Sequence, residues 1–106
     1  MPKMDSVKER VPLLRLLAFG TKRQQLELLR QANPGLIRCL CECALNLLKG
    51  NIPLTPKQKT FLKRHKTGLR YLTQRNRSLK HKKQRLTQRG GGAFLPVLLK
   101  VVLSLL

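Results

Sequence analysis

The stretch from Thr55 to Arg89 constrains this chain most, because it holds thirteen lysines and arginines among thirty-five residues and no aspartate or glutamate. A run of like charge repels itself and gains most when the phosphates of a partner replace its counterions. The fold therefore has to present this stretch as a charged face. The predicted phosphate contacts are Lys57, Lys59, Lys63, Arg64, Lys66, Arg70, Arg75, Arg77, Lys80, Lys82, Lys83, Arg85 and Arg89.

Positive charge also predominates in the whole chain and is concentrated towards its carboxyl-terminal part. The formal charge is +19 and the isoelectric point about 11.5. All four acids, Asp5, Glu9, Glu27 and Glu42, lie in the first 42 residues, and none follows. A polyanionic partner is therefore predicted, with nucleic acid as the first choice and an anionic membrane as the second. With 106 residues, a small core is expected but a deep catalytic cleft is not, and we predict neither an enzyme nor a cofactor.

The first fifty residues predict a leucine-rich bundle of three short helices, and the fold class is all-α. Residues 12–19 suit a helix that Gly20 ends, with Leu13, Leu16 and Leu17 on one side. Thr21 followed by Gln24 has the pattern of a capping box that opens a second helix. Its inward-facing residues are expected to be Leu26, Leu29 and Ala32 or Leu28.

A third helix is predicted from Asn33 and Pro34 to Lys49, where Gly50 closes it. Its apolar residues follow the helical period at Ile37, Leu40, Cys41, Ala44, Leu45 and Leu48. The charged residues 1–10 and the interrupted apolar residues 11–19 do not have the pattern of a secretory signal, so the chain is expected inside a cell.

Three cysteines lie on this third helix. Cys39 and Cys43 are one turn apart, while Cys41 points nearly the opposite way, so the three cannot converge on one metal ion unless the helix unwinds. Buried or half-buried thiols are the preferred interpretation. A zinc site that recruits His65 or His81, and a redox or intermolecular disulfide, are the alternatives. No metal is predicted.

Residues 51–89 are predicted to form a basic helical arm. Thr55 and Pro56 have the pattern of a helix start, and Ser78 is expected to cap a last basic helix over residues 79–88. Gly68 weakens the arm and suggests a bend. An apolar stripe is expected at Phe61, Leu62, His65, Leu69 and Leu72, with Lys59, Lys63, Lys66 and Arg70 on another face. A continuous helix over these residues would be about 50 Å long.

The sequence of the arm indicates what kind of contact it makes. It shows no helix-turn-helix, zinc-finger or RNA-recognition pattern, and Phe61 and Tyr71 are its only aromatic residues for base stacking. The remaining mode of contact is binding to DNA or RNA without sequence preference, through neutralisation of backbone phosphates. The alternatives are a solvated basic face or a nuclear-localisation signal at residues 80–85. His65 and His81 have no carboxylate or nucleophile beside them in the sequence, so neither is predicted to be catalytic.

Three glycines, Gly90, Gly91 and Gly92, predict a hinge before the almost wholly apolar residues 93–106. Those fourteen residues span about 21 Å as a helix, short of a bilayer core of about 30 Å. One interpretation folds this tail onto the leucine faces or onto a second copy, and the other places it in a membrane interface. Its predicted contact residues are Phe94, Leu95, Val97, Leu98, Leu99, Val101, Val102, Leu103, Leu105 and Leu106.

The end of the chain runs from basic residues into Arg89, then three glycines, then Ala93-Phe94-Leu95-Pro96-Val97-Leu98-Leu99. This order resembles the carboxyl half of the adenovirus core protein X family, the precursors of the mu peptide, where a very basic segment meets a glycine pair and an apolar tail containing Leu-Pro. The whole chain, including residues 39–48 and 50–56, is similar to the X-type proteins of adintoviruses and Polinton elements, adenovirus-related DNA viruses integrated in animal genomes.

The resemblance implies a virion core protein that condenses double-stranded DNA, located in the virion and the host nucleus, with the basic residues as phosphate contacts. Contact of the tail with a membrane or a capsid protein, and self-association, are further expectations. Adenovirus protease sites have an apolar residue two places before the glycine pair, where this chain has Gln88 or Arg89. The resemblance therefore does not imply that a protease removes the tail of this chain.

Overall fold

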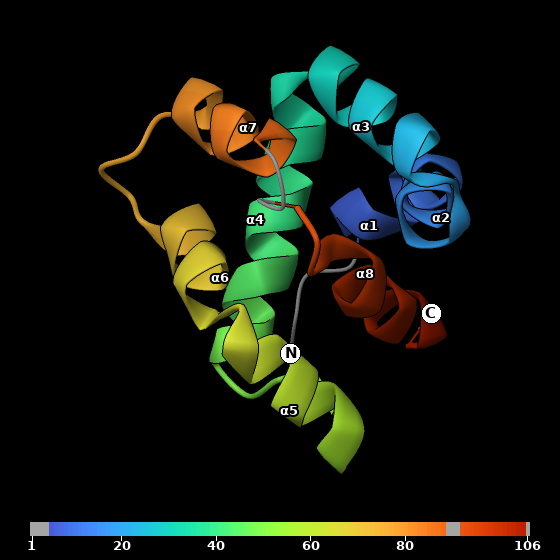
Figure 1. The fold of residues 1–106 in the computed structure, drawn as a ribbon, viewed down its shortest axis with the longest axis vertical. Coiled ribbons are helices and arrows are strands. Elements are labelled where there is room, and N and C mark those ends of the chain that lie inside the picture. The colour runs from blue at the N-terminus through green and yellow to red at the C-terminus, as the bar shows by residue number, and fades with distance from the viewer. Residues whose placement is uncertain (1–4, 89–91, 106) are drawn as a thin grey trace.

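The computed structural model describes residues 5–88 and 92–105, and within them the chain forms eight α-helices and no strand (Figure 1). The helices are α1 Asp5–Glu9, α2 Val11–Phe19, α3 Lys22–Gln31, α4 Pro34–Leu48, α5 Pro56–Arg64, α6 Lys66–Thr73, α7 Leu79–Thr87 and α8 Leu95–Ser104. The molecule measures 31 × 27 × 24 Å along its principal axes. The predicted all-α class is confirmed.

Four helices begin at the caps that the sequence predicts. The side chains of Thr21 and Thr55 each accept a hydrogen bond from the backbone N–H three residues later. The side-chain oxygens of Gln24 and Gln58 in turn accept a bond from the backbone N–H of the threonine, so both capping boxes are complete. Asn33 and Ser78 cap α4 and α7 in the same way. These bonds satisfy backbone donors that the first turn of a helix leaves unpaired.

The carboxyl end of α4 is also where the sequence predicts it. Gly50 adopts φ +78°, the left-handed region that a glycine enters without a Cβ penalty, directly after Lys49 closes the helix. The helix α1 was not predicted from the sequence, because it is a single short helix with no capping pattern before it.

The long helix α4 lies at the centre, and α6, α7 and α8 pack on it (Figure 1). It is therefore buried over a wider arc than one stripe. Leu36, Ile37, Cys39, Leu40, Cys43, Ala44 and Leu47 are all buried. The predicted positions Ile37, Leu40 and Ala44 are confirmed, Cys41 and Leu45 are half-buried, and Leu48 is exposed.

Of the three leucines expected on one side of α2, only Leu17 is buried, and the inward face predicted for α3 is right in part. In α2 the buried residues are Leu14, Leu17 and Ala18, while Leu13 and Leu16 are exposed. Apolar side chains occur on nearly every side of α2, so periodicity does not identify which side meets the core. In α3, Leu29 and Ala32 are buried, and Leu26 and Leu28 are half-buried.

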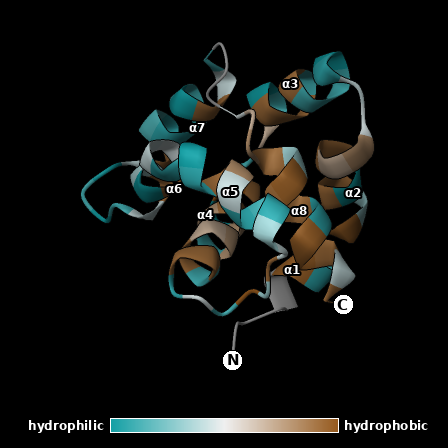
Figure 2. Ribbon diagram, turned by 60° about the horizontal axis from the view of Figure 1, so that its bottom comes forward, coloured by the Kyte–Doolittle hydropathy of each residue, from teal (hydrophilic) through white to brown (hydrophobic). Residues whose placement is uncertain are grey.

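The terminal helix α8 is part of the core. It packs chiefly against α2 and also against α4 and α5, and in Figure 2 its apolar residues lie beside those of α1 and α2. Phe94, Leu95, Leu98, Leu99, Val101 and Val102 are buried, and Val97 and Leu103 pack against them. Of the predicted tail contacts only Leu105 is exposed, and Leu106 lies outside the described residues. This arrangement agrees with the interpretation that residues 93–106 fold back onto the leucine faces of the other helices.

The basic segment forms three separate helices and not one extended helix: α6 and α7 pack on α4, and α5 packs on α6 and α8. The break falls at His65, which ends α5 and precedes α6, and not at Gly68. Gly68 lies within α6, where a Cβ would be 3.0 Å from the Phe94 ring. A glycine at this position therefore lets the ring of the tail approach the α6 backbone. The apolar stripe is confirmed, with Leu62, Leu69 and Leu72 buried and Phe61 and His65 half-buried.

Candidate nucleic-acid interface

Most cations of the described basic segment are exposed, on α5, α6, the turn after α6 and the start of α7, whereas the leucines of these helices face the core. Hydrophilic residues predominate along these helices (Figure 2). No acid occurs in the sequence after Glu42, so this surface has no carboxylate side chain of its own. Nine of the predicted phosphate contacts are exposed: Lys57, Lys59, Lys63, Arg64, Lys66, Arg70, Arg75, Arg77 and Lys80.

Three other predicted contacts are less accessible, and Arg89 lies outside the described residues. Lys82 is only 8% exposed and packs between α7 and α4. The Nζ atom of Lys83 donates a hydrogen bond to the carbonyl oxygen of Ala32 at 3.0 Å. Ala32 caps the carboxyl end of α3, where unpaired carbonyls and the helix dipole favour a cation. The contact of Lys83 therefore stabilises the fold, and the burial of Lys82 leaves little of its side chain accessible to a phosphate. Arg85 is half-buried.

Replacing Lys83 with Met should lower the free energy of unfolding by about 1 kcal/mol, because a charge-assisted bond to a part-buried carbonyl is lost while the apolar stem is kept. Thermal unfolding followed by circular dichroism measures the change, expected as a fall of about 4 °C or more. The control is Lys80→Met on the exposed side of the same helix, which should leave the midpoint unchanged. Equal midpoints for the two variants would contradict the structural role of Lys83.

Both aromatic rings of the basic segment contact other side chains of this chain. The Phe61 ring lies 4.9 Å from His65, whose ring is 6.2 Å from Phe94. The guanidinium carbons of Arg77 and Arg85 lie 5.1 and 5.3 Å from the centre of the Tyr71 ring. Sequence reasoning did not find this cluster, because its members come from α6, the following turn and α7. Base stacking on these rings would have to displace the contacts that they already make.

The cysteines have the surroundings expected of structural thiols. Cys39 and Cys43 are buried, Cys41 is half-buried, and none of the three forms a disulfide. Burial raises the pKa of Cys41, although the charge of Lys82 opposes this effect. A hydrogen bond with Cys39 and burial raise the pKa of Cys43 well above its ordinary value. Thiols whose pKa is raised are poor nucleophiles and metal ligands. Across residues 5–88 and 92–105, no cluster of three metal-ligating side chains occurs.

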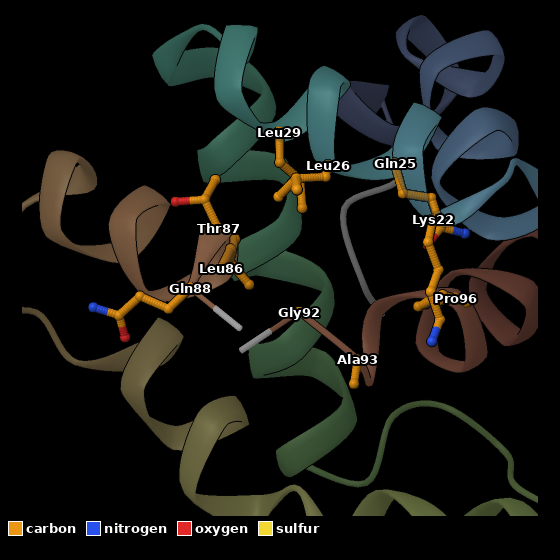
Figure 3. Close-up of a pocket in the computed structure, with 10 residues that line it drawn as sticks. All are labelled: Lys22, Gln25, Leu26, Leu29, Leu86, Thr87, Gln88, Gly92, Ala93 and Pro96. Carbon is orange, nitrogen blue, oxygen red and sulfur yellow. The ribbon is translucent and has the colours of Figure 1, made fainter. Parts of the chain in front are cut away.

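Gly92 marks a close approach between α7 and the start of α8. A Cβ there would lie 2.9 Å from the carbonyl oxygen of Leu86, so this position is packed tightly. The hinge predicted at Gly90 and Gly91 lies outside the described residues. Beside this approach, a cavity of about 300 Å³ opens between α3, the end of α7 and Pro96 (Figure 3). Lys22 is the one charged residue in its described lining, which therefore offers no pair of acid and base groups.

The comparisons with known proteins add nothing to this description. The chain was compared with protein-family models, with curated proteins and with solved structures, and none of the three comparisons finds a match.

Proposed function

We propose that this protein binds double-stranded DNA without sequence preference and compacts it by neutralising phosphates. The observation that carries the proposal is the surface of nine exposed lysines and arginines on α5, α6, the turn to α7 and the start of α7, in a part of the chain that has no acid. Nonspecific affinity for DNA comes essentially from this electrostatic term and the counterions that it releases. No catalytic role is proposed.

The packing of the aromatic rings supports duplex DNA as the ligand. Proteins that hold single strands usually offer open rings to successive bases. Phe61 and Tyr71 contact neighbouring side chains instead. Binding then depends on charge density, which is high in a duplex at one charge per about 1.7 Å of axis. Double-stranded RNA offers similar charge and is compared with DNA in the same assay.

The resemblance to the core protein X family of adenoviruses, adintoviruses and Polinton elements supports a viral role for this DNA-binding activity. In that role the protein would condense a viral genome in the virion core and be present in the host nucleus. The leucine-rich core of α2, α4 and α8 would serve to fold α5–α7 into a fixed surface. Self-association through the exposed Leu13, Leu16 and Phe19 would add bridges between DNA segments.

The test is a salt titration with two unrelated duplexes of equal length. Equal dissociation constants are expected, with log K falling linearly against log salt concentration. The nine exposed cations and the half-buried Arg85 set the limit of the slope at about −9, because each neutralised phosphate contributes about 0.9. Absence of binding at low salt, or a strong preference for one duplex, would contradict the proposal.

A membrane-active role is the alternative, in which the tail inserts and the basic segment holds anionic headgroups. The buried positions of Phe94, Leu98 and Leu99 require α8 to leave the core before it can insert. Within the described ranges, no helix has the length and apolar character to cross a bilayer. Because α8 is buried in the core, we prefer the DNA-binding function. Release of dye from anionic vesicles would favour the alternative.

A further inference from the structure

We propose that Arg77 and Arg85, held against the ring of Tyr71, form the principal phosphate-binding site of the basic surface. The ligand is a phosphodiester group of a nucleic-acid backbone. This inference rests on the proposed DNA-binding function and names the part of the surface that anchors it.

The three side chains come together from separate elements. Tyr71 lies on α6, Arg77 in the turn that follows, and Arg85 in the last turn of α7. Because the guanidinium carbons are 5.1 and 5.3 Å from the same ring centre, they are at most about 10 Å apart. Nearby phosphates of one strand can contact both, since a strand rises about 3.4 Å per nucleotide. Arginine is suited to this contact, because its planar guanidinium can donate two parallel bonds to phosphate.

Both arginines contact neighbouring side chains of the protein itself. The Nε atom of Arg77 donates to Oε1 of Gln74 at 3.0 Å, and the ring holds the guanidinium face. The terminal amino groups of Arg77 keep their donors for a phosphate. Arg85 is half-buried, which restricts its side chain further. An ordered side chain loses less conformational entropy on binding than a free one, so these two contribute more affinity per charge.

Arg64 and Arg70 provide the contrast. Both are exposed on α5 and α6, and in the described part of the chain their side chains make no hydrogen bond or ring contact. They carry the same charge as Arg77 and Arg85 but are not held in place. If charge alone governs binding, the two pairs are equivalent.

The first experiment compares R77Q/R85Q with R64Q/R70Q in a fluorescence-anisotropy titration of a 20-base-pair duplex at fixed salt. Each variant removes two positive charges. R77Q/R85Q is expected to weaken binding about ten-fold more than R64Q/R70Q. Equal losses in the two variants would overturn the site while leaving the proposed function standing. Failure of the unmodified protein to bind the duplex would overturn both.

The second experiment leaves the charge unchanged. Tyr71→Phe keeps the ring and should bind as the unmodified protein does, whereas Tyr71→Leu should weaken binding about three-fold or more because the arginines lose their support. Circular dichroism and the thermal midpoint show whether each variant is folded. A folded Tyr71→Leu protein with unmodified affinity would overturn the proposal. Weakened binding in that folded variant, restored by Phe, would support it.

Discussion

Deletion of residues 90–106 is expected to unfold the protein, not to release a free basic segment. The deletion removes Phe94, Leu95, Leu98, Leu99, Val101 and Val102, all of them buried. Full burial of each such side chain stabilises a fold by about 1.5 to 3 kcal/mol. Their sum is comparable with the whole free energy of unfolding of a small domain, about 5 to 15 kcal/mol. The faces of α2 and α4 that α8 covers would also become exposed.

Far-UV circular dichroism and thermal unfolding measure this effect, and loss of the cooperative transition is the expected result. A point substitution makes the same test without shortening the chain. Leu98→Asp places a carboxylate at a position with 0% exposure and should unfold the protein. Lys100→Asp on the exposed side of the same helix should remain folded, although it removes the cation from the Phe19 ring. A truncated chain that still unfolds cooperatively would contradict the role of α8.

The starts of four helices were predictable because an N-cap bond or a capping box joins residues only three positions apart. Thr21 with Gln24 and Thr55 with Gln58 form their bonds whatever surrounds the helix. The helical spacing of leucines and cations on α5 and α6 likewise predicts which face of each helix packs against the core. Local chemistry and the helical period were sufficient for both features.

The remaining features depend on contacts between distant residues. Nothing near Lys83 in the sequence indicates that its side chain reaches Ala32, which is 51 residues away. The Phe94 ring meets Gly68 across the core, so the glycine that suggested a bend instead provides room for a side chain. The Tyr71 cluster also needs the fold, because the turn before α7 brings its arginines to the ring.

Replacing Lys59, Lys63, Lys66 and Arg70 with Gln should weaken DNA binding strongly. All four are exposed, with the first pair one turn apart on α5 and the second one turn apart on α6. If all four contact phosphates, the slope of log K against log salt becomes shallower by about 3.6. The affinity at 0.1 M salt then falls by up to about three orders of magnitude, since the electrostatic term scales with that slope. Exposed side chains contribute little to the packing of the core, so the midpoint of thermal unfolding should change little.

The matched control replaces Lys8, Lys22, Arg30 and Lys49, which are also three lysines and one arginine, all exposed, in the amino-terminal part of the chain. Both variants lower the formal charge from +19 to +15. Titration of the same duplex at several salt concentrations gives the slope for each. A much smaller change in the control shows that the phosphates lie along α5 and α6. Equal changes would show that net charge, not its position on the fold, governs binding, and would contradict the interface assigned to these helices.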